Sequence, residues 1–453
     1  MGDKRAVLKP LAPLQAGNAV NDPWDRVAEI LKVIVEPVFA PRIFDITAHG
    51  AVGDGVADCT QAFRDAITAC HAGGGGRVLV PAGQWLTGAI HLKSNVDLHL
   101  AQGATIKFSR DPNAYLPLVR TRWEGTELLN YSAFIYAFEQ ENIAITGDGT
   151  LDGQADDDHW WNWDRLLRAG GKDNARRRLH HMNDQSVPLA KRVFGDGALL
   201  RPNFITLFRC KNILIADVTL RRSPMWQIHP LECDNITIRR VTMEASGPNT
   251  DGCDPESCSH VLIEDCSFNT GNDCIAIKSG RNNDGRKLMI PSKNLIVRRC
   301  HVRGGHGGIT LGSEIAGGVC NVFVEDCFME GPNLRYALRI KNNARRGGEI
   351  EHVYCRRIDI SHVYLSVLRI DFQYEEGPDG VHMPSVRNVR LEQLTCEQCP
   401  RIAEIHSFDN AVVAAIVLKD SKFANVAKRS IVENAPALIL ENVVVHGQNV
   451  IAV

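Results

Sequence analysis

The 453-residue sequence predicts an all-β fold: a right-handed, single-stranded parallel β-helix with an N-terminal capping helix. The first observation is a short unit that recurs between residues 85 and 450, with a polar or small residue, then Asn or His, then alternating aliphatic residues. The repeated position is occupied by Asn95, Asn142, Asn212, Asn235, His260, Asn294, Asn321, His352 and Asn388. From Asn212 onward the repeats are 23 to 36 residues apart, a period typical of solenoids, propellers and repeat arrays.

The second observation is the character of the segments between these positions. They are short, rich in β-branched residues and alternate in hydropathy, which indicates strands. No helical pattern of ten or more residues separates them, so βαβ units are excluded. A propeller needs hairpin turns, and the Asn-Gly signals of such turns are missing. A parallel β-helix remains.

Ladders of like residues should fill and border this solenoid. We expect the repeated Asn to bond the backbone of the next coil. Cys266, Cys300 and Cys327 share one position of the repeat and predict a stacked, buried thiol ladder, since a free Cys packs as a small apolar residue. Disulfides are the alternative for these cysteines.

The end of a solenoid must be covered, because its last coil exposes apolar surface. Residues 58–72 form the best helical pattern in the chain, and "GGGG" at 73–76 ends it. Its apolar stripe consists of Ala62, Phe63, Ala66, Ile67 and Cys70. We therefore divide the chain into an N-terminal extension (1–41) and a β-helix domain (42–453), with a long polar insertion at 154–200 that contains Trp160, Trp161 and Trp163.

Composition excludes several classes of partner. The formal net charge of −2 gives no polyanion-binding signature, and we interpret Arg176–Arg178 as a solvated loop, so no nucleic acid is expected. No apolar run of 18 residues exists, so no membrane span is expected. Only Cys396 and Cys399 form a C-x-x-C pair, which predicts neither a metal nor another cofactor. The first residues lack an apolar signal region, which favours a cytoplasmic protein; a secreted or periplasmic protein with its signal removed is the alternative.

Charged residues recur at similar positions of successive coils. Asp251 in "GPNTDGCDPESC" is followed by Asp273 after 22 residues, by His306 after another 33, and by Arg339 after another 33, with Lys341 on the same strand face. With a two-residue offset, carboxylates on adjacent strands lie about 8 Å apart. That separation suits an inverting glycosidase, which needs room for a water molecule. Arg and Lys together suit a substrate carboxylate.

The motifs "NTDG" (249–252), "GNDC" (271–274), "GGHGG" (304–308) and "RIK" (339–341) resemble those of the polygalacturonases, glycoside hydrolase family 28 of the pectin-lyase-like superfamily. They occur in the family's order, and the similarity covers roughly residues 42–450. The resemblance implies a hydrolase that cleaves α-1,4-galacturonosidic linkages of pectin with inversion and without a metal. It implies catalytic roles for Asp251, Asp273 and His306, and galacturonate binding by Asn249, Arg339 and Lys341.

One position departs from the family pattern. Many members have two adjacent aspartates in the second motif, the first being taken as the acid, and this chain has Asn272 there. We expect Asp273 to act as the acid and Asp251 as the base, because two carboxylates suffice for inversion; weak or altered activity is the alternative. Asp254 and Glu256 are reserve candidates.

Further residues are candidates for substrate binding. Lys278, just after the second motif, could reach a uronate, and Trp226 and His229 lie on the preceding coil. The tryptophans of the insertion either stack on sugar or pack internally. The insertion and the 282–293 loop favour exo cleavage by closing one end of a cleft. A rhamnogalacturonan hydrolase, a polysaccharide lyase and a glycan-binding β-helix with little catalysis are the alternatives.

Overall fold

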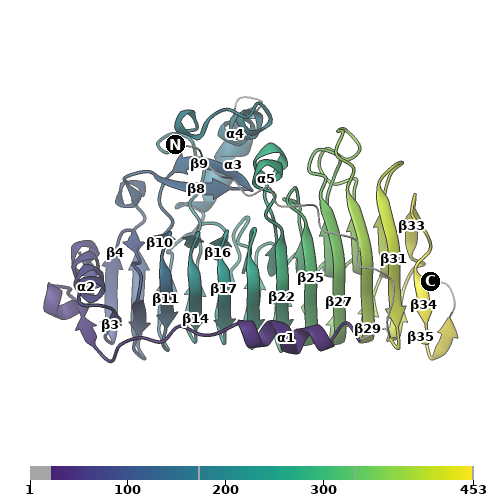
Figure 1. Cartoon of the computed structure of the whole chain (residues 1–453), viewed down its shortest axis with the longest axis horizontal. Helices are drawn as coiled ribbons and strands as arrows, with labels where there is room; N and C mark the ends of the chain where they lie inside the picture. Colours follow the sequence, from purple (N-terminus) through teal and green to yellow (C-terminus); the bar gives the residue numbers. More distant parts are fainter. Residues whose placement is uncertain (1–21, 172–173, 332, 451–453) are drawn as a thin grey trace, which may run out of the picture.

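The computed structural model describes residues 22–171, 174–331 and 333–450. The chain winds into a right-handed parallel β-helix whose coils stack along one long axis (Figure 1). This confirms the predicted fold class. The first 21 residues of the predicted N-terminal extension lie outside the described residues.

Two groups of strands form the walls of the solenoid. The larger group contains β1 (Ile43–Asp45), β2 (Asp54–Asp58), β3 (Gly76–Val80), β4 (Gly83–Thr87), β6 (Val96–Leu100), β7 (Ala104–Phe108), β11 (Glu141–Thr146), β12 (Thr150–Asp152), β14 (Lys211–Ala216), β15 (Thr219–Arg221), β17 (Asp234–Arg239), β18 (Thr242–Ala245), β19 (Ser259–Glu264), β20 (Ser267–Thr270), β22 (Ser292–Arg298), β23 (His301–Gly304), β25 (Val319–Met329), β27 (Glu349–His362), β29 (Ser385–Cys399), β31 (Val412–Lys419), β32 (Lys422–Val426), β34 (Ile439–Glu441), β35 (Val443–Val445) and β36 (Gln448–Val450). The smaller group contains β5 (Ile90–His91), β10 (Ile135–Phe138), β13 (Ile205–Phe208), β16 (Ile228–Leu231), β21 (Ile275–Ile277), β24 (Gly307–Leu311), β26 (Tyr336–Lys341), β28 (Ser366–Asp371), β30 (Arg401–His406) and β33 (Ile431–Glu433). We call the outer surface of this smaller group the site face.

Side-chain alternation explains why these segments form strands around one core. In β21, Ile275 and Ile277 point inward, and their register partners Ile309 and Leu311 in β24 do the same. The same inward position is apolar in coil after coil, so one continuous hydrophobic core runs through the solenoid. The intervening residues point outward and are free to be polar.

The repeated Asn positions form a ladder at a bend. All nine residues of the predicted repeat have a positive φ, between 52° and 63°, a conformation that Asn tolerates better than most residues. We expected backbone contacts to the next coil, but the amides bond one another: Asn142 donates to Asn95 (3.0 Å), Asn212 to Asn142 (2.9 Å) and Asn235 to Asn212 (2.8 Å). Amides suit this arrangement because each carries both a donor and an acceptor.

The cysteines predicted as a ladder are buried. Cys266, Cys300 and Cys327 are free thiols on successive coils. Cys300 follows β22, and Cys327 lies in β25. Backbone hydrogen bonds from His301 N to Cys266 O and from Phe328 N to Cys300 O join the three successive coils. Burial raises the pKa of Cys300 well above its ordinary value, so it stays a neutral apolar group.

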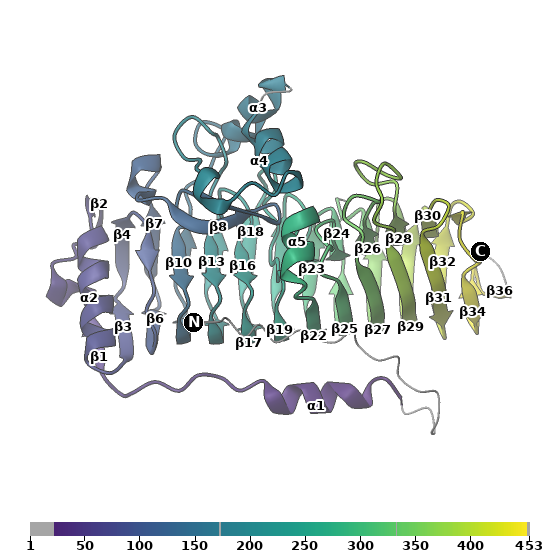
Figure 2. The ribbon, with the colours of Figure 1, turned by 45° about the horizontal axis from the view of Figure 1, so that its top comes forward.

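Helices cover one end and one side of the solenoid. The predicted capping helix is α2 (Thr60–Ala72), which buries all five residues of its predicted apolar stripe. Helix α1 (Asp25–Val33), in the predicted extension, runs along the outside of the larger wall (Figure 2). There Trp24 packs against Phe323 and its indole donates to Glu392 (2.7 Å). Residues 22–41 are therefore packed onto the β-helix.

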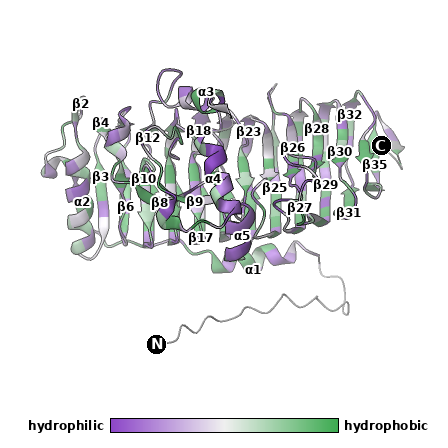
Figure 3. Cartoon of the chain, turned by 90° about the horizontal axis from the view of Figure 1, so that it is seen from above, coloured by the Kyte–Doolittle hydropathy of each residue, from purple (hydrophilic) through white to green (hydrophobic). Residues whose placement is uncertain are grey.

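A separate layer stands above the site face. It comprises the antiparallel hairpin of β8 (Val119–Trp123) and β9 (Thr126–Asn130), with α3 (Trp161–Ala169) and α4 (Ala175–Asp184) from the insertion, near α5 (Asn282–Leu288). Helices α4 and α5 are largely hydrophilic (Figure 3). Short 3-10 helices η1 (Ile46–His49), η2 (Pro112–Tyr115) and η4 (Leu189–Lys191) complete the described elements.

The tryptophans of the insertion pack inside the protein. Trp160 is buried against Tyr115, Phe134 and Trp163, and the Trp161 indole donates to Ser223 O (2.9 Å). Internal packing is therefore the alternative that the structure favours for Trp160. Within the described ranges, no helix is both long and apolar enough to cross a membrane.

The ladder makes a prediction for stability. Asn235 donates to Asn212 and to Val35 O (2.7 Å), accepts from Val35 N (3.0 Å), and has φ 58°. We expect Asn235→Ala to lose about 4–5 kcal/mol of unfolding free energy, from three hydrogen bonds of about 1 kcal/mol each and a left-handed backbone penalty of about 1–2 kcal/mol. Asn235→Gly should recover the backbone part only. Denaturant midpoints measure this, and equal midpoints for wild type and the Ala variant would contradict it.

Candidate active site

Register places the charged side chains in rows across the site face. In one row Thr310, Arg339, Arg369 and Glu404 are successive partners, and in the next Lys341 is followed by Asp371, His406 and Glu433. Adjacent parallel strands lie about 4.8 Å apart, so neighbours in a row are within reach of each other. Arg369 accordingly bridges Glu404 (2.7 Å) and Asp371 (2.9 Å).

The two predicted carboxylates are direct neighbours. Gly252 N donates to Asp273 O (3.0 Å), and Cys253 pairs with Ile275, so Asp251 and Asp273 stand at the same level of adjacent coils. The two-residue offset expected from the sequence is therefore wrong. The 22 residues from Asp251 to Asp273 equal the separation of the paired residues Cys253 and Ile275, so no offset remains between the two aspartates. Any separation of the two carboxyl groups must come from the directions of their side chains.

The Asp273 side chain leans away from Asp251, across the next coil. Lys341 Nζ lies 2.7 Å from Asp273 Oδ2, and Arg339 Nη1 lies 3.5 Å from Oδ1, although both cations belong to β26, two strands away. Gly307 on the strand between makes this possible. A Cβ at Gly307 would lie 3.0 Å from Asp273 Oδ1 and 2.3 Å from Thr310 Oγ1. The glycine of "GGHGG" thus leaves the space through which the ion pair forms.

The surroundings give the two carboxyls opposite pKa shifts. Burial raises the pKa of Asp251 to about 6, even though the charge of Lys278 opposes this, and the charge of Asp273 adds to it. Burial alone would also raise the pKa of Asp273, but the charges of Lys341 and Arg339 outweigh it and hold that pKa well below its ordinary value. Asp251 is 1% exposed and Asp273 0%. We expected Asp273 to carry the proton, and the electrostatics favour Asp251 instead.

Asn272 and His306 complete the immediate surroundings. Asn272 Nδ2 donates to Asp251 Oδ1 (2.9 Å), so the residue that departs from the family pattern orients Asp251. His306 is half-buried and its backbone N donates to Asn272 O (2.7 Å). Burial lowers the pKa of His306 to about 4, and the charge of Arg335 adds to this, so its imidazole is neutral near pH 6.

The structure does not place Trp226, His229 and Lys278 where a substrate could touch them. Trp226 is buried beneath the insertion, with Lys278 Nζ 4.6 Å from its ring centre. His229 is fully buried: Nε2 bonds Glu256 (2.9 Å) and Nδ1 bonds Asn203 (2.9 Å). These rings lie under the β8–β9 hairpin, which the sequence did not reveal as a cover.

The remaining residues that the sequence suggested also have partners within the protein. Lys278 lies 3.3 Å from both Asp254 Oδ1 and Glu314 Oε2. Asp254 is fully buried, and burial, together with the charge of Asp251, raises its pKa well above the ordinary value. Asn249 accepts from Arg201 Nη2 (3.0 Å). Of the predicted site residues, Asn249, His306 and Arg339 are partly exposed.

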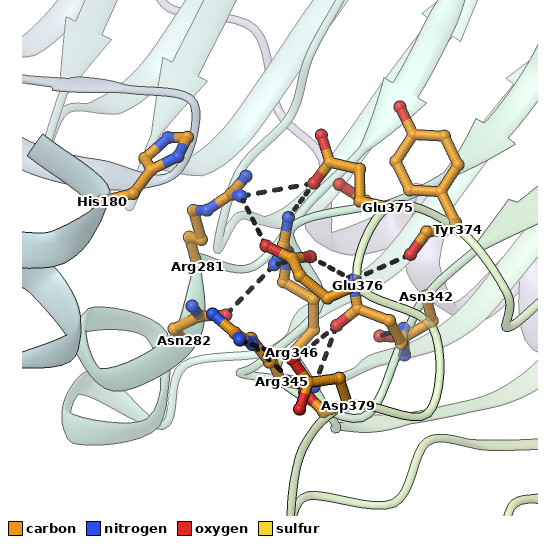
Figure 4. A network of polar contacts seen from close by, with 12 residues as sticks. His180, Arg281, Asn282, Asn342, Arg345, Arg346, Tyr374, Glu375, Glu376 and Asp379 are labelled. Atoms are coloured by element: carbon orange, nitrogen blue, oxygen red, sulfur yellow. Dashed lines mark hydrogen bonds and ion pairs between the residues drawn. The ribbon is translucent and has the colours of Figure 1, made fainter. Parts of the chain in front are cut away.

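Sequence reasoning missed an ionic network beside these carboxylates (Figure 4). Arg281 lies 3.3 Å from Glu375 and 3.6 Å from Glu376, and Arg346 lies 3.0 Å from Glu376. The adjacent Tyr374 ring lies 5.6 Å from the Arg339 guanidinium and 5.4 Å from Lys341 Nζ. Tyr374 comes three residues after Asp371, the register partner of Lys341, so it lies beyond the end of β28, where the repeat spacing gives no signal for it.

The site face is closed on one side of Asp251. Toward the N-terminus, Tyr136, Thr206 and His229 share a row and are all buried. The hairpin above them is anchored by Arg122, which pairs with Glu256 (3.0 Å) and with Glu232. Its tip docks beside the site, where Arg281 N donates to Gly125 O (3.0 Å). Toward the C-terminus, Arg339, Arg369 and His406 remain partly exposed, so access is from that side.

No group of three or more His, Cys, Asp or Glu side chains in the described part of the chain could hold a metal ion.

Comparisons with known proteins find relatives of this chain. A model of the glycosyl hydrolases family 28 matches residues 195–400. A probable polygalacturonase of Vitis vinifera is 34% identical over 319 residues, 68% of this chain and 58% of that protein. An exo-poly-alpha-D-galacturonosidase of Dickeya chrysanthemi is 28% identical over 356 residues, 74% of this chain and 58% of that protein. The chain thus spans a little over half the length of these two relatives.

A solved structure matches nearly end to end. The exopolygalacturonase of Thermotoga maritima superimposes with a TM-score of 0.90 at 40% sequence identity, over 95% of this chain and 98% of that one. With this identity over almost the whole of both chains, the protein belongs to the glycosyl hydrolases family 28.

Proposed function

We propose that the protein hydrolyses α-1,4-galacturonosidic linkages of galacturonan or its oligomers, with inversion, and that it removes units from a chain end. The observation that carries this proposal is the pair of register-aligned carboxyls with opposite pKa shifts, enclosed on one side and flanked on the other by partly exposed Arg339. Membership of the family and the similarity to an exopolygalacturonase support it.

Asp251 supplies the proton to the leaving oxygen in this proposal. A pKa near 6 matches a general acid that works in mildly acidic to neutral solution. Asn272 occupies Oδ1 of the same carboxyl, which leaves Oδ2 to carry the proton. Transfer from Oδ2 to the glycosidic oxygen breaks the bond to the anomeric carbon.

Asp273 orients the attacking water. Its low pKa makes it a weak base, but the water becomes strongly acidic once its oxygen bonds to the anomeric carbon, and a weak base then accepts the proton. Because the Asp273 side chain points toward Lys341, space is left beside Asp251 for the water molecule that inversion requires. Arg339, partly exposed at the same place, binds the galacturonate carboxylate through its planar fork.

Exo action follows from the covered side of the site. A polymer that ran through the site in both directions would collide with the hairpin over Tyr136 and His229. Only a chain end can therefore lie against Asp251, while the rest of the chain extends over Arg369 and His406.

The direct test is a digestion of polygalacturonate followed by product size over time. We expect one short product to accumulate from the start, with little loss of polymer viscosity per bond cleaved, and slower cleavage of the methyl-esterified polymer. Early oligomers of many sizes would instead indicate endo action. A product with unsaturated 4,5-absorbance would indicate a lyase, and no product would indicate glycan binding without catalysis.

Both carboxylates should be needed for hydrolysis. We expect Asp251→Asn and Asp273→Asn each to lower kcat by about 100-fold or more, because general acid–base assistance contributes at least that much. Thermal unfolding should show that both variants fold. Asp265→Asn is the matched control, since Asp265 pairs with Arg299 at the surface. Retention of more than about a tenth of wild-type kcat by either variant would remove that residue from the mechanism.

The pH profile should separate the two roles. Asp251 is protonated below its pKa of about 6, so kcat/KM should fall about tenfold per pH unit above that value. Asn272→Asp replaces a donor to Asp251 with a like charge, which raises the pKa of Asp251, so the falling limb should move to higher pH. A falling limb that stays in place in Asn272→Asp would show that Asp251 is not the acid.

A further inference from the structure

The turn that carries Asp251 is bound by a buried arginine, Arg201, which directly follows the insertion. Arg201 Nη1 donates to Pro248 O (2.6 Å) and to Pro224 O (2.9 Å), and Nη2 donates to Asn249 Oδ1 (3.0 Å). Pro248 and Asn249 stand three and two positions before Asp251. The arginine is 1% exposed, so these bonds do not compete with water.

The insertion fixes this arginine in turn. Asp164 on α3 lies 3.3 Å from Arg201 Nη2 and also binds Arg168 (2.6 Å). The carbonyl of Arg201 accepts from the Trp123 indole of the hairpin (3.0 Å). Burial lowers the pKa of Arg201 to about 10, with the charge of Asp164 opposing, so the guanidinium keeps its charge at neutral pH.

A second contact from α3 presses on the same turn. A Cβ at Gly247 would lie 2.2 Å from the Trp161 ring, so the indole rests directly on the backbone at the start of the turn. Inside the turn, Thr250 Oγ1 donates to Gly247 O (2.7 Å) and accepts from Gly271 N (3.1 Å), which ties the turn to the coil of Asp273.

Asn249 shows why the turn needs external support. Its φ of 55° is a left-handed conformation that costs free energy for a residue with a side chain. Its side-chain oxygen is satisfied by Arg201, which favours the strained conformation over alternatives in which that bond is absent.

We propose that Arg201, held by Asp164 of α3, is a positioning residue that sets the place of Asp251 relative to Asp273. The inference rests on the proposed function of these two carboxyls. It gives the 154–200 insertion a role beside that of the hairpin: the hairpin covers one side of the site, and α3 of the insertion holds the arginine that fixes the turn. Arg201 itself touches no reacting atom.

The test compares variants of Arg201 and Asp164 in the full-length protein. We expect Arg201→Met to lower kcat by roughly 100-fold with KM changed less than about threefold, because a displacement of about 1 Å at a reacting group costs that much. Arg201→Lys keeps the charge and should recover part of the loss. Asp164→Asn, on a partly exposed helix position, should fold normally and lower kcat by about three- to tenfold.

The matched control is Arg222→Met, which removes another arginine that binds an aspartate, Asp152 (2.8 Å), and does not contact the turn. It should keep wild-type kcat. Wild-type kcat in folded Arg201→Met and Asp164→Asn variants would overturn the proposal, as would a loss confined to KM.

A crystallographic measurement keeps the two proposals distinguishable. The turn at 247–251 should move by about 1 Å in Arg201→Met, or in Asp164→Asn if the first variant does not fold. An unmoved turn overturns the positioning role whether or not the wild type hydrolyses galacturonan. A wild type without hydrolysis, but with a turn that moves in the variants, overturns the proposed function alone.

Discussion

Hydrogen bonding between parallel coils in fixed register is the constraint on which the rest of this molecule depends. It sets residues from distant parts of the sequence side by side at about 4.8 Å, so that Asp251 and Asp273 meet although 22 residues separate them. The register is fixed at one bend by amide side chains with left-handed backbones, Asn95 and Asn142 among them, and along the strands by inward aliphatic residues. A slip of one residue would exchange core and surface in a whole coil, so the stacking also protects the site.

The two aspartates that this register brings together differ in their pKa because their neighbours differ. Asp273 lies beside two cations, and their attraction exceeds the cost of burying a charge. Asp251 is equally buried, but its closest partner is the neutral amide of Asn272, and burial then favours the protonated form. A second aspartate in place of Asn272 is therefore not required to hold a proton here, because the environment already makes Asp251 the protonated member of the pair.

The sequence predicts local features well and lateral contacts poorly. The repeated Asn positions, the capping helix and the charged motifs depend on residue patterns within a few positions, and the structure contains them. The level register of Asp251 and Asp273 depends on which residues pair between the two coils, and no local pattern records it. Burial of Trp226 and His229 depends on a hairpin some 100 residues earlier in the chain, whose fit to the site face is decided by tertiary contacts such as those of Arg122 with Glu232 and Glu256.

The insertion shows how such tertiary contacts turn a common scaffold into a specific site. The solenoid alone would present an open row of side chains along its length, accessible from both directions. The hairpin covers the row on one side of Asp251, and Arg201 connects that hairpin, α3 and the turn of Asp251 through bonds made by one side chain and one carbonyl. Because Arg201 binds both the hairpin that covers the site and the turn of Asp251, access to the site and the position of the turn are coupled. A change that opened the covered side by moving the hairpin away from Arg201 would therefore also disturb the turn of Asp251.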